Sequence, residues 1–279
     1  MTSLSFVVAP TSLWRTLTHA QRIGLAILCS FGLFLLIEAL CFNYDPALQN
    51  LSNAFATPTW QEPLGTDQFG RSNVSRLADA IITSLSMAVL SVITSALLGI
   101  SAGVLAGWKQ GWWDRSFSFA VNVILAMPGL VLVLLFGAIV PGSFLILYMA
   151  ISLILSIEYF RVVRSHARTA VNSPAVEASQ LYGFSDWYIF KRHLWPACRR
   201  DVLVLACFGA GNAILALASI GFLHVGLRPP HAELGLMMVE LFRYYQDAPW
   251  VLLQPIIVIM LLVFSFYLLT QGEDNDIAN

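Results

Sequence analysis

IITSLSMAVLSVITSALLGISAGVLAGW, residues 81–108, is a long run of mostly apolar residues. A helix rises about 1.5 Å per residue, so this run exceeds the roughly 30 Å hydrocarbon core of a bilayer. Within it Gly99, Gly103 and Gly107 recur at every fourth residue. Such a repeat strips side chains from one face of a helix and lets another backbone approach closely. The run therefore predicts a transmembrane helix that packs tightly through these glycines.

Five further apolar runs lie on either side of this one. They cover residues 23–42, 117–140, 144–160, 202–223 and 250–269. Each is expected to be helical, because a helix satisfies its own backbone hydrogen bonds in lipid. The 279-residue chain is 58% hydrophobic and only 11% charged, whereas soluble domains have roughly 25% charged residues. We therefore expect an all-α membrane protein with six transmembrane helices.

Two of these spans contain proline, at Pro128, which Gly129 follows, and at Pro255. Each proline frees backbone groups that a neighbouring helix or a water-lined cavity must satisfy. A packing kink and a hinge on a translocation path both account for such breaks, and the sequence leaves both interpretations open.

The distribution of Lys and Arg between the spans predicts the orientation. If the N-terminus is cytoplasmic, 11 of the 15 basic residues lie in cytoplasmic segments and 4 lie outside. The positive-inside rule then places both termini in the cytoplasm. The predicted segments are a cytoplasmic N-terminal segment 1–22, a first transmembrane helix 23–42, an outer loop 43–80, a five-helix core 81–269 that includes a cytoplasmic loop 161–201, and a cytoplasmic tail 270–279.

The charged residues exclude two classes of function. The formal net charge is −1, so no basic field is available to hold nucleic acid. The two lysines, Lys109 and Lys191, are followed by glutamine and arginine, so neither belongs to a GxxxxGK[ST] phosphate loop. No HExxH or GxSxG motif occurs, and no residue spacing predicts a metal site. We expect a chain that is not an enzyme and binds no metal or cofactor itself.

The cytoplasmic segment 172–196, NSPAVEASQLYGFSDWYIFKRHLWP, contains more helix signals than a passive connector needs. Ser173 is a suitable N-cap for a helix that starts at Pro174. Glu177 lies near the positive end of that helix, and Gly183 supplies a left-handed stop. The sequence predicts a short, well-defined helix here.

A second helix is predicted to start at residues 185–186 and to stop before Pro196. On it Trp187, Phe190 and Leu194 fall on one face as an apolar stripe flanked by basic residues. An apolar stripe in a cytoplasmic loop must be buried against something. The pattern supports equally a helix folded back onto the membrane interface and a helix docked to a partner protein.

The same segment resembles the EAA loop, EAA-x3-G-x9-I-x-LP, of permease subunits in binding-protein-dependent ABC importers. The match departs from that pattern at Ser179, His193 and Trp195. The positions that carry it are Glu177, Ala178, Gly183 and Pro196.

Two outer motifs narrow the resemblance to the C-type permease of peptide and nickel importers. LGTDQFGRSNVSR, residues 64–76, is similar to the family signature LGTDxxGRDxxSR, with Ser72 in place of the usual aspartate. SIGFLHVGLRPPHAELG, residues 219–235, is similar to FLGLG-x-PP-x-WG, with His224 and Leu234 as departures. Together the three motifs extend the resemblance over about residues 64–269 and are highly specific.

The first outer motif supplies the candidate residues of the outer face. They are Gly65, Thr66, Asp67, Gly70 and Arg71. Asp67 and Arg71 lie four residues apart, and an ion pair that orders the segment is favoured over contact with a substrate.

The resemblance implies the type I ABC importer permease fold in a bacterial inner membrane. In that family the EAA loop forms a coupling helix that docks on a cytosolic ATPase. The coupling residues so implied are Glu177, Ala178, Ser179, Gly183, Trp187 and Phe190. Glu177 and the turn at Gly183 would transmit nucleotide-driven closure, while small residues at 178 and 179 would let the helix lie close to the ATPase.

The resemblance also implies an assembly. We expect two different permease subunits in membrane lipid, two ATPases that bind ATP and Mg²⁺, and an extracytoplasmic solute-binding protein. The substrate would be a peptide, nickel or a metal chelate. An ion-coupled secondary transporter is the alternative, but the apolar runs lack the paired central carboxylates that such coupling needs.

Overall fold

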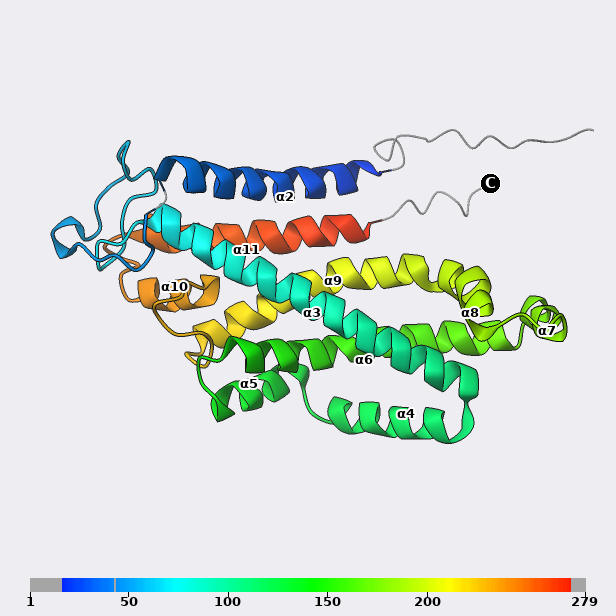
Figure 1. Cartoon of the computed structure of the whole chain (residues 1–279). Coiled ribbons are helices and arrows are strands. Elements are labelled where there is room, and N and C mark those ends of the chain that lie inside the picture. The colour runs from blue at the N-terminus through cyan, green and yellow to red at the C-terminus, as the bar shows by residue number, and fades with distance from the viewer. Residues whose placement is uncertain (1–16, 43, 272–279) are drawn as a thin grey trace, which may run out of the picture.

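The computed structural model describes residues 17–42 and 44–271, and in this part of the chain every regular element is helical. Figure 1 shows the long helices running side by side, with α10 near one end of the molecule and α7 and α8 at the other. The elements are α2 (His19–Ile37), the π-helix η1 (Glu38–Phe42), the 3-10 helix η2 (Leu51–Asn53), α3 (Asn73–Lys109), α4 (Gly111–Leu125), α5 (Gly129–Ile139), α6 (Phe144–Val171), α7 (Pro174–Leu181), α8 (Asp186–Ile189), the π-helix η3 (Phe190–Leu194), α9 (Trp195–Phe222), α10 (Leu234–Phe242) and α11 (Pro249–Thr270).

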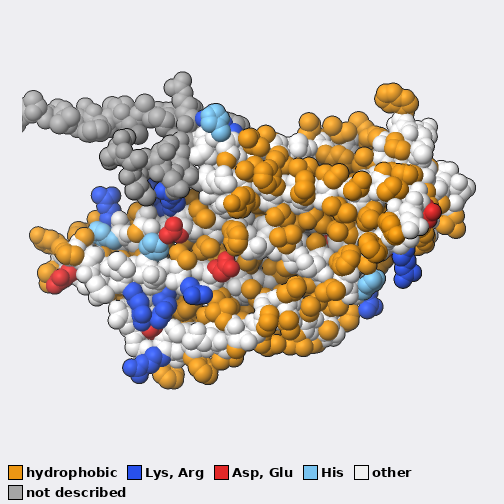
Figure 2. Space-filling view, turned by 180° about the vertical axis from the view of Figure 1, so that it is seen from behind, with side chains coloured by type: hydrophobic (Ala, Val, Ile, Leu, Met, Phe, Trp, Pro, Cys, Tyr) orange, Lys and Arg blue, Asp and Glu red, His pale blue; other side chains and the backbone are white. Residues whose placement is uncertain are grey.

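Five helical segments of the described chain are long and apolar enough to cross a membrane, and α4 with α5 makes a sixth if the pair is one broken span. The five are His19–Phe42, Asn73–Lys109, Phe144–Val171, Asp186–Phe222 and Pro249–Thr270. Figure 2 shows one face of the molecule, with an apolar middle and Lys and Arg side chains gathered toward its two ends. The prediction of an all-α membrane protein is confirmed.

The third predicted span, residues 117–140, is not one straight helix. The axes of α4 and α5 are bent by 81° at the break between them. Pro128 precedes α5 and has no N–H to donate, and the residue before a proline is disfavoured in the helical conformation. Pro128 thus marks the place of the break, and an angle of 81° is larger than a kink, whereas Pro255 stays inside α11.

Several helices are longer than the apolar runs that predicted them. Helix α3 begins at Asn73 rather than at residue 81, and α6 continues to Val171 rather than ending at residue 160. Apolar runs report only the part of a helix that is suited to lipid, so they miss the polar turns at its ends.

Helices α3 and α6 pack closely along much of their length. Gly99, Gly103 and Gly107 are buried on the face of α3 that meets α6. A Cβ atom added to Gly103 would lie 2.9 Å from the Phe160 carbonyl oxygen, and one on Gly107 would lie 2.5 Å from the Ala167 Cβ. The glycine column thus lets the two backbones approach. Helix α9 packs against both α3 and α6, α11 packs against α9, and α2 packs against α11.

Candidate functional site

Helix α7 lies at the end of the molecule where α6 leaves the bundle (Figure 1). The Ser173 side chain accepts a hydrogen bond from the Val176 N–H, and Pro174 occupies the first turn, where an N–H has no helical partner. Glu177 also lies in the first turn, where the positive end of the helix dipole favours a carboxylate. The start of α7 is therefore encoded locally.

The end of α7 depends on a glycine. Gly183 adopts a φ of +76°, and its N–H donates to the Gln180 carbonyl oxygen at 2.9 Å. The Phe184 N–H donates to the Ser179 carbonyl oxygen at 3.1 Å, which completes a Schellman cap. Among the described residues, and apart from its chain neighbours, no atom lies within 4 Å of the place that a Cβ on Gly183 would occupy. Backbone conformation rather than space requires glycine here.

The two sides of α7 differ in exposure. Val176 and Ser179 are buried against the rest of the chain. Glu177 and Ala178 are exposed, and Leu181 is 83% exposed. Successive helical residues are about 100° apart around the axis, which separates position 178 from position 179. The structure thus places Ser179 on the inner side of α7, whereas Glu177, Ala178 and Leu181 are among its exposed residues.

The helix after α7 does not stop before Pro196, so that prediction is wrong. Elements α8, η3 and α9 form one continuous helix, Asp186–Phe222. In the π-helical turn the Trp195 N–H donates to the Phe190 carbonyl oxygen, five residues back. Pro196, which has no N–H to donate, follows directly after this turn, where the backbone departs from the regular α-helical hydrogen-bond pattern. The wide turn accommodates the proline.

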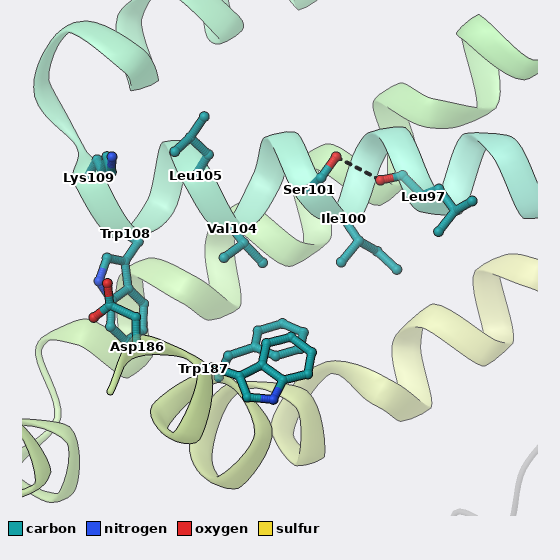
Figure 3. A pocket seen from close by; sticks show the side chains of 10 residues that line it. Leu97, Ile100, Ser101, Val104, Leu105, Trp108, Lys109, Asp186 and Trp187 are labelled. Carbon is teal, nitrogen blue, oxygen red and sulfur yellow. Dashed lines mark hydrogen bonds between the residues drawn. The ribbon is translucent and has the colours of Figure 1, made fainter. Parts of the chain in front are cut away.

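A largely apolar groove of about 650 Å³ lies between the inner part of α3 and the start of this helix. Figure 3 shows Ile100 and Val104 pointing from α3 toward Trp187 across the groove. Trp187 stacks on Phe190 with ring centroids 5.4 Å apart, while Leu194 is fully buried. Trp187 and Phe190 of the predicted apolar stripe therefore line the groove opposite α3, whereas Leu194 is not among its lining residues.

The opposite end of the molecule contains a buried cluster of charged side chains. Asp67 Oδ2 accepts hydrogen bonds from Arg71 Nε and from Arg76 Nη1, both at 2.6 Å. Glu240 Oε2 accepts from Arg71 Nη2 at 3.0 Å and from Arg76 Nη2 at 2.7 Å. The side chains of Asp67, Arg71 and Arg76 are at most 6% exposed. We call these four residues the outer cluster; its two positive and two negative charges compensate each other.

The outer cluster ties the loop before α3 to α10. The ion pair between Asp67 and Arg71 is present as predicted. The sequence did not predict that Arg76 and Glu240 take part in the same cluster. Arg76 stands in the first outer motif, but Glu240 lies 164 residues further along the chain. No local pattern in the sequence identifies Glu240 as the partner.

The other outer-motif residues hold the backbone of this loop. Gly65 and Gly70 have φ values of +72° and +68°, and a Cβ on Gly70 would overlap the Asn50 carbonyl group. The Thr66 hydroxyl accepts a hydrogen bond from the Ala56 N–H at 2.8 Å. These contacts join residues 50–56 to residues 65–70 and define one loop conformation.

Another buried acid, Glu233, lies at the start of α10. Its carboxylate accepts hydrogen bonds from the N–H groups of Gly235 at 2.9 Å and Leu236 at 2.8 Å. Burial raises the pKa of Glu233 to about 7, an effect that these two donors partly offset. A Cβ on Gly221 would overlap the Glu233 carboxylate. This contact gives a structural reason for glycine at position 221 in the second outer motif.

Comparison with known proteins identifies a family. Residues 99–274 match the family model described as "Binding-protein-dependent transport system inner membrane component". The chain is 30% identical over 250 residues to the dipeptide transport system permease protein DppC of Alkalihalophilus pseudofirmus, which covers 90% of this chain and 82% of that protein. It is also 30% identical over 231 residues to the glutathione transport system permease protein GsiD of Pectobacterium atrosepticum. This match covers 83% of this chain and 74% of that protein.

A solved structure shares the fold. A chain of the MetNI methionine ABC transporter, in inward-facing conformations, has a TM-score of 0.51 at 17% sequence identity. The likeness covers 69% of this chain and 91% of that one. With its apolar helices, the protein has the architecture of a multi-pass inner-membrane permease. The chain belongs to the family of binding-protein-dependent transport system inner membrane components, the permease subunits of ABC importers.

Proposed function

We propose that this chain is one of two different permease subunits in an ATP-driven importer of small peptides. Relatives at 30% identity are named as dipeptide, di/tripeptide and glutathione permeases, which supports a peptide substrate. The membrane helices of this chain would form half of the translocation pathway, and the second permease would form the other half.

The observation that carries the proposal is the exposed face of α7. This helix has a defined start and a defined end, yet Glu177, Ala178 and Leu181 contact little of the chain itself. The sequence contains no phosphate loop, so energy from ATP must come from another subunit. A preformed helix with one unpartnered face suits docking to a cytosolic ATPase, which would bind ATP and Mg²⁺.

The outer end supports a second part of the proposal. Residues 44–72 are held by the outer cluster and by the glycine contacts of the first outer motif. A loop fixed in one conformation loses little entropy when a partner binds it. We assign this surface to an extracytoplasmic solute-binding protein that delivers the peptide.

The test is a charge reversal in the complete transporter. Glu177→Lys should lower dipeptide uptake and ATPase co-purification at least tenfold, because it reverses the charge that α7 presents at the interface. Asp247→Lys, a charge reversal at an exposed position outside residues 44–72, serves as the matched control and should retain its ATPase. Membrane insertion of both variants should match that of the parent protein. A fully active Glu177→Lys transporter that retains its ATPase would remove the coupling role of this residue.

A backbone variant provides an independent test of the same helix. Gly183→Val places a branched side chain at a positive φ and should also abolish uptake. Gly183→Asn should retain most activity, since asparagine tolerates the left-handed conformation. Equal uptake by the valine and asparagine variants would show that the Schellman cap is not needed for transport.

A further inference from the structure

Two positions at which the inner loop departs from the EAA pattern lie against each other. Ser179 Oγ on α7 is 3.0 Å from His193 Nε2 on η3. The family pattern has alanine and isoleucine at these positions, and neither side chain can form a hydrogen bond. A serine beside isoleucine, or a histidine beside alanine, would lack this partner. The two departures are therefore complementary.

The direction of this hydrogen bond follows from a second contact. Ser179 Oγ lies 2.9 Å from the Ala175 carbonyl oxygen, which can only accept. The hydroxyl proton of Ser179 is used in that bond, so its lone pairs face His193. His193 Nε2 must then carry the proton and act as the donor.

The contact lies between two elements that otherwise meet through few side chains. Ser179 and Val176 are the buried side chains of α7. On the other element, His193 lies next to the buried Leu194, and Ile189 is buried five residues before Leu194. The π-helical turn η3 carries both His193 and Leu194. His193 is itself partly buried and meets α7 through the contact with Ser179.

We infer that the Ser179–His193 hydrogen bond is a positioning contact that fixes α7 to the helix Asp186–Phe222. That helix continues through α9 into the membrane, so a displacement of α7 would be passed to the membrane-spanning part through this bond. The connecting turn between them is short and depends on the backbone of Gly183. The inference rests on the proposed coupling role of α7 and names the residues that link it to α9.

The test is a double-mutant cycle in the complete transporter, reconstituted in lipid vesicles. The variants are Ser179→Ala, His193→Ile and the two together, and the readout is peptide transported per ATP hydrolysed. Ser179→Ala should lower this ratio about fivefold, the factor that corresponds to one net hydrogen bond, because the His193 N–H loses its acceptor. His193→Ile should lower it less, because Ser179 keeps its bond to Ala175.

The double variant Ser179→Ala/His193→Ile tests whether the two side chains act together on the transport ratio. It recreates the alanine and isoleucine of the family pattern, so its ratio should return to within about twofold of the parent value. His193→Gln keeps an N–H donor and should also retain most of the coupling. Thr169→Ala is the matched control, because Thr169 makes the same kind of bond to a carbonyl four residues back but is exposed and lies outside this contact.

Three outcomes would contradict the inference. Strictly additive effects of the single variants would show that the two side chains are not coupled. An unchanged transport ratio in Ser179→Ala, with intact assembly, would leave the bond without a positioning role. Loss of hydrogen-exchange protection in α7 with unchanged transport would make the contact purely structural. The proposed function is tested separately, by whether Glu177→Lys retains its ATPase.

Discussion

The first outer motif and helix α7, at opposite ends of the molecule, place their charged residues differently. At the outer end, the charges of Asp67, Arg71, Arg76 and Glu240 are satisfied by one another inside the chain. At the inner end, α7 turns Glu177 and its neighbours away from the chain. The difference shows that contacts within the chain fix this part of the outer loop, whereas α7 has one face that the described residues leave uncovered.

The largest effect is expected from breaking the outer cluster. Asp67→Ala leaves Arg71 and Arg76 buried with Glu240 as their remaining acid, and loss of one partner from a buried ion pair costs about 3–5 kcal/mol. Thermal unfolding of the purified complex should show a much lower midpoint. Asp45→Ala removes an exposed carboxylate from the same region and is the control. Equal midpoints for the two variants would contradict a stabilising outer cluster.

The buried Glu233 should make the stability of the outer end depend on pH. Its pKa is raised from 4.5 to about 7 in the folded protein, so folding favours the protonated form. The contribution of Glu233 to the free energy of unfolding is fully present below pH 4.5. It is lost as the pH rises through about 7, and the loss amounts to about 3 kcal/mol at most. Thermal unfolding midpoints of the purified complex between pH 5 and pH 8 measure this loss of stability. Glu233→Gln should flatten the profile, and an unaltered slope in that variant would assign the dependence to other groups.

A smaller effect is expected between the two ends, where α3 packs on α6. Gly103→Leu forces a side chain against the Phe160 backbone and should destabilise the complex by about 1–3 kcal/mol. Gly32→Leu is the matched control, because no atom of the described residues outside its own helix backbone lies within 4 Å of a Cβ at that position. The yield and unfolding midpoint of each purified complex measure the difference. Similar values for both variants would show that the glycine column does not require close packing.

Local signals in the sequence predicted the features that depend on neighbouring residues. The start of α7 at Pro174 and its end at Gly183 follow from capping and backbone rules, and the apolar runs located the membrane helices. The pairing of Asp67 with Arg71 was predictable because both stand in one short motif. In each case the interacting residues are close together along the chain.

Features that depend on distant residues could not be predicted. Glu240 reaches Arg76 only because α10 folds back onto the start of α3. The contact of Ser179 with the rest of the chain depends on the position of η3. The residue pattern did not predict the π-helical turn that forms η3. The 81° angle between α4 and α5 likewise exceeds what Pro128 alone dictates. Tertiary contacts decide these features.

The most direct test of the account is to identify what covers the exposed face of α7. A photoreactive amino acid placed at Leu181, which is 83% exposed, should cross-link to the ATPase subunit in the assembled transporter. The same probe at Leu48, which is 66% exposed in the outer loop, should not reach the ATPase. Cross-linking from position 181 to lipid alone, with no ATPase adduct in an active complex, would contradict the proposed docking surface.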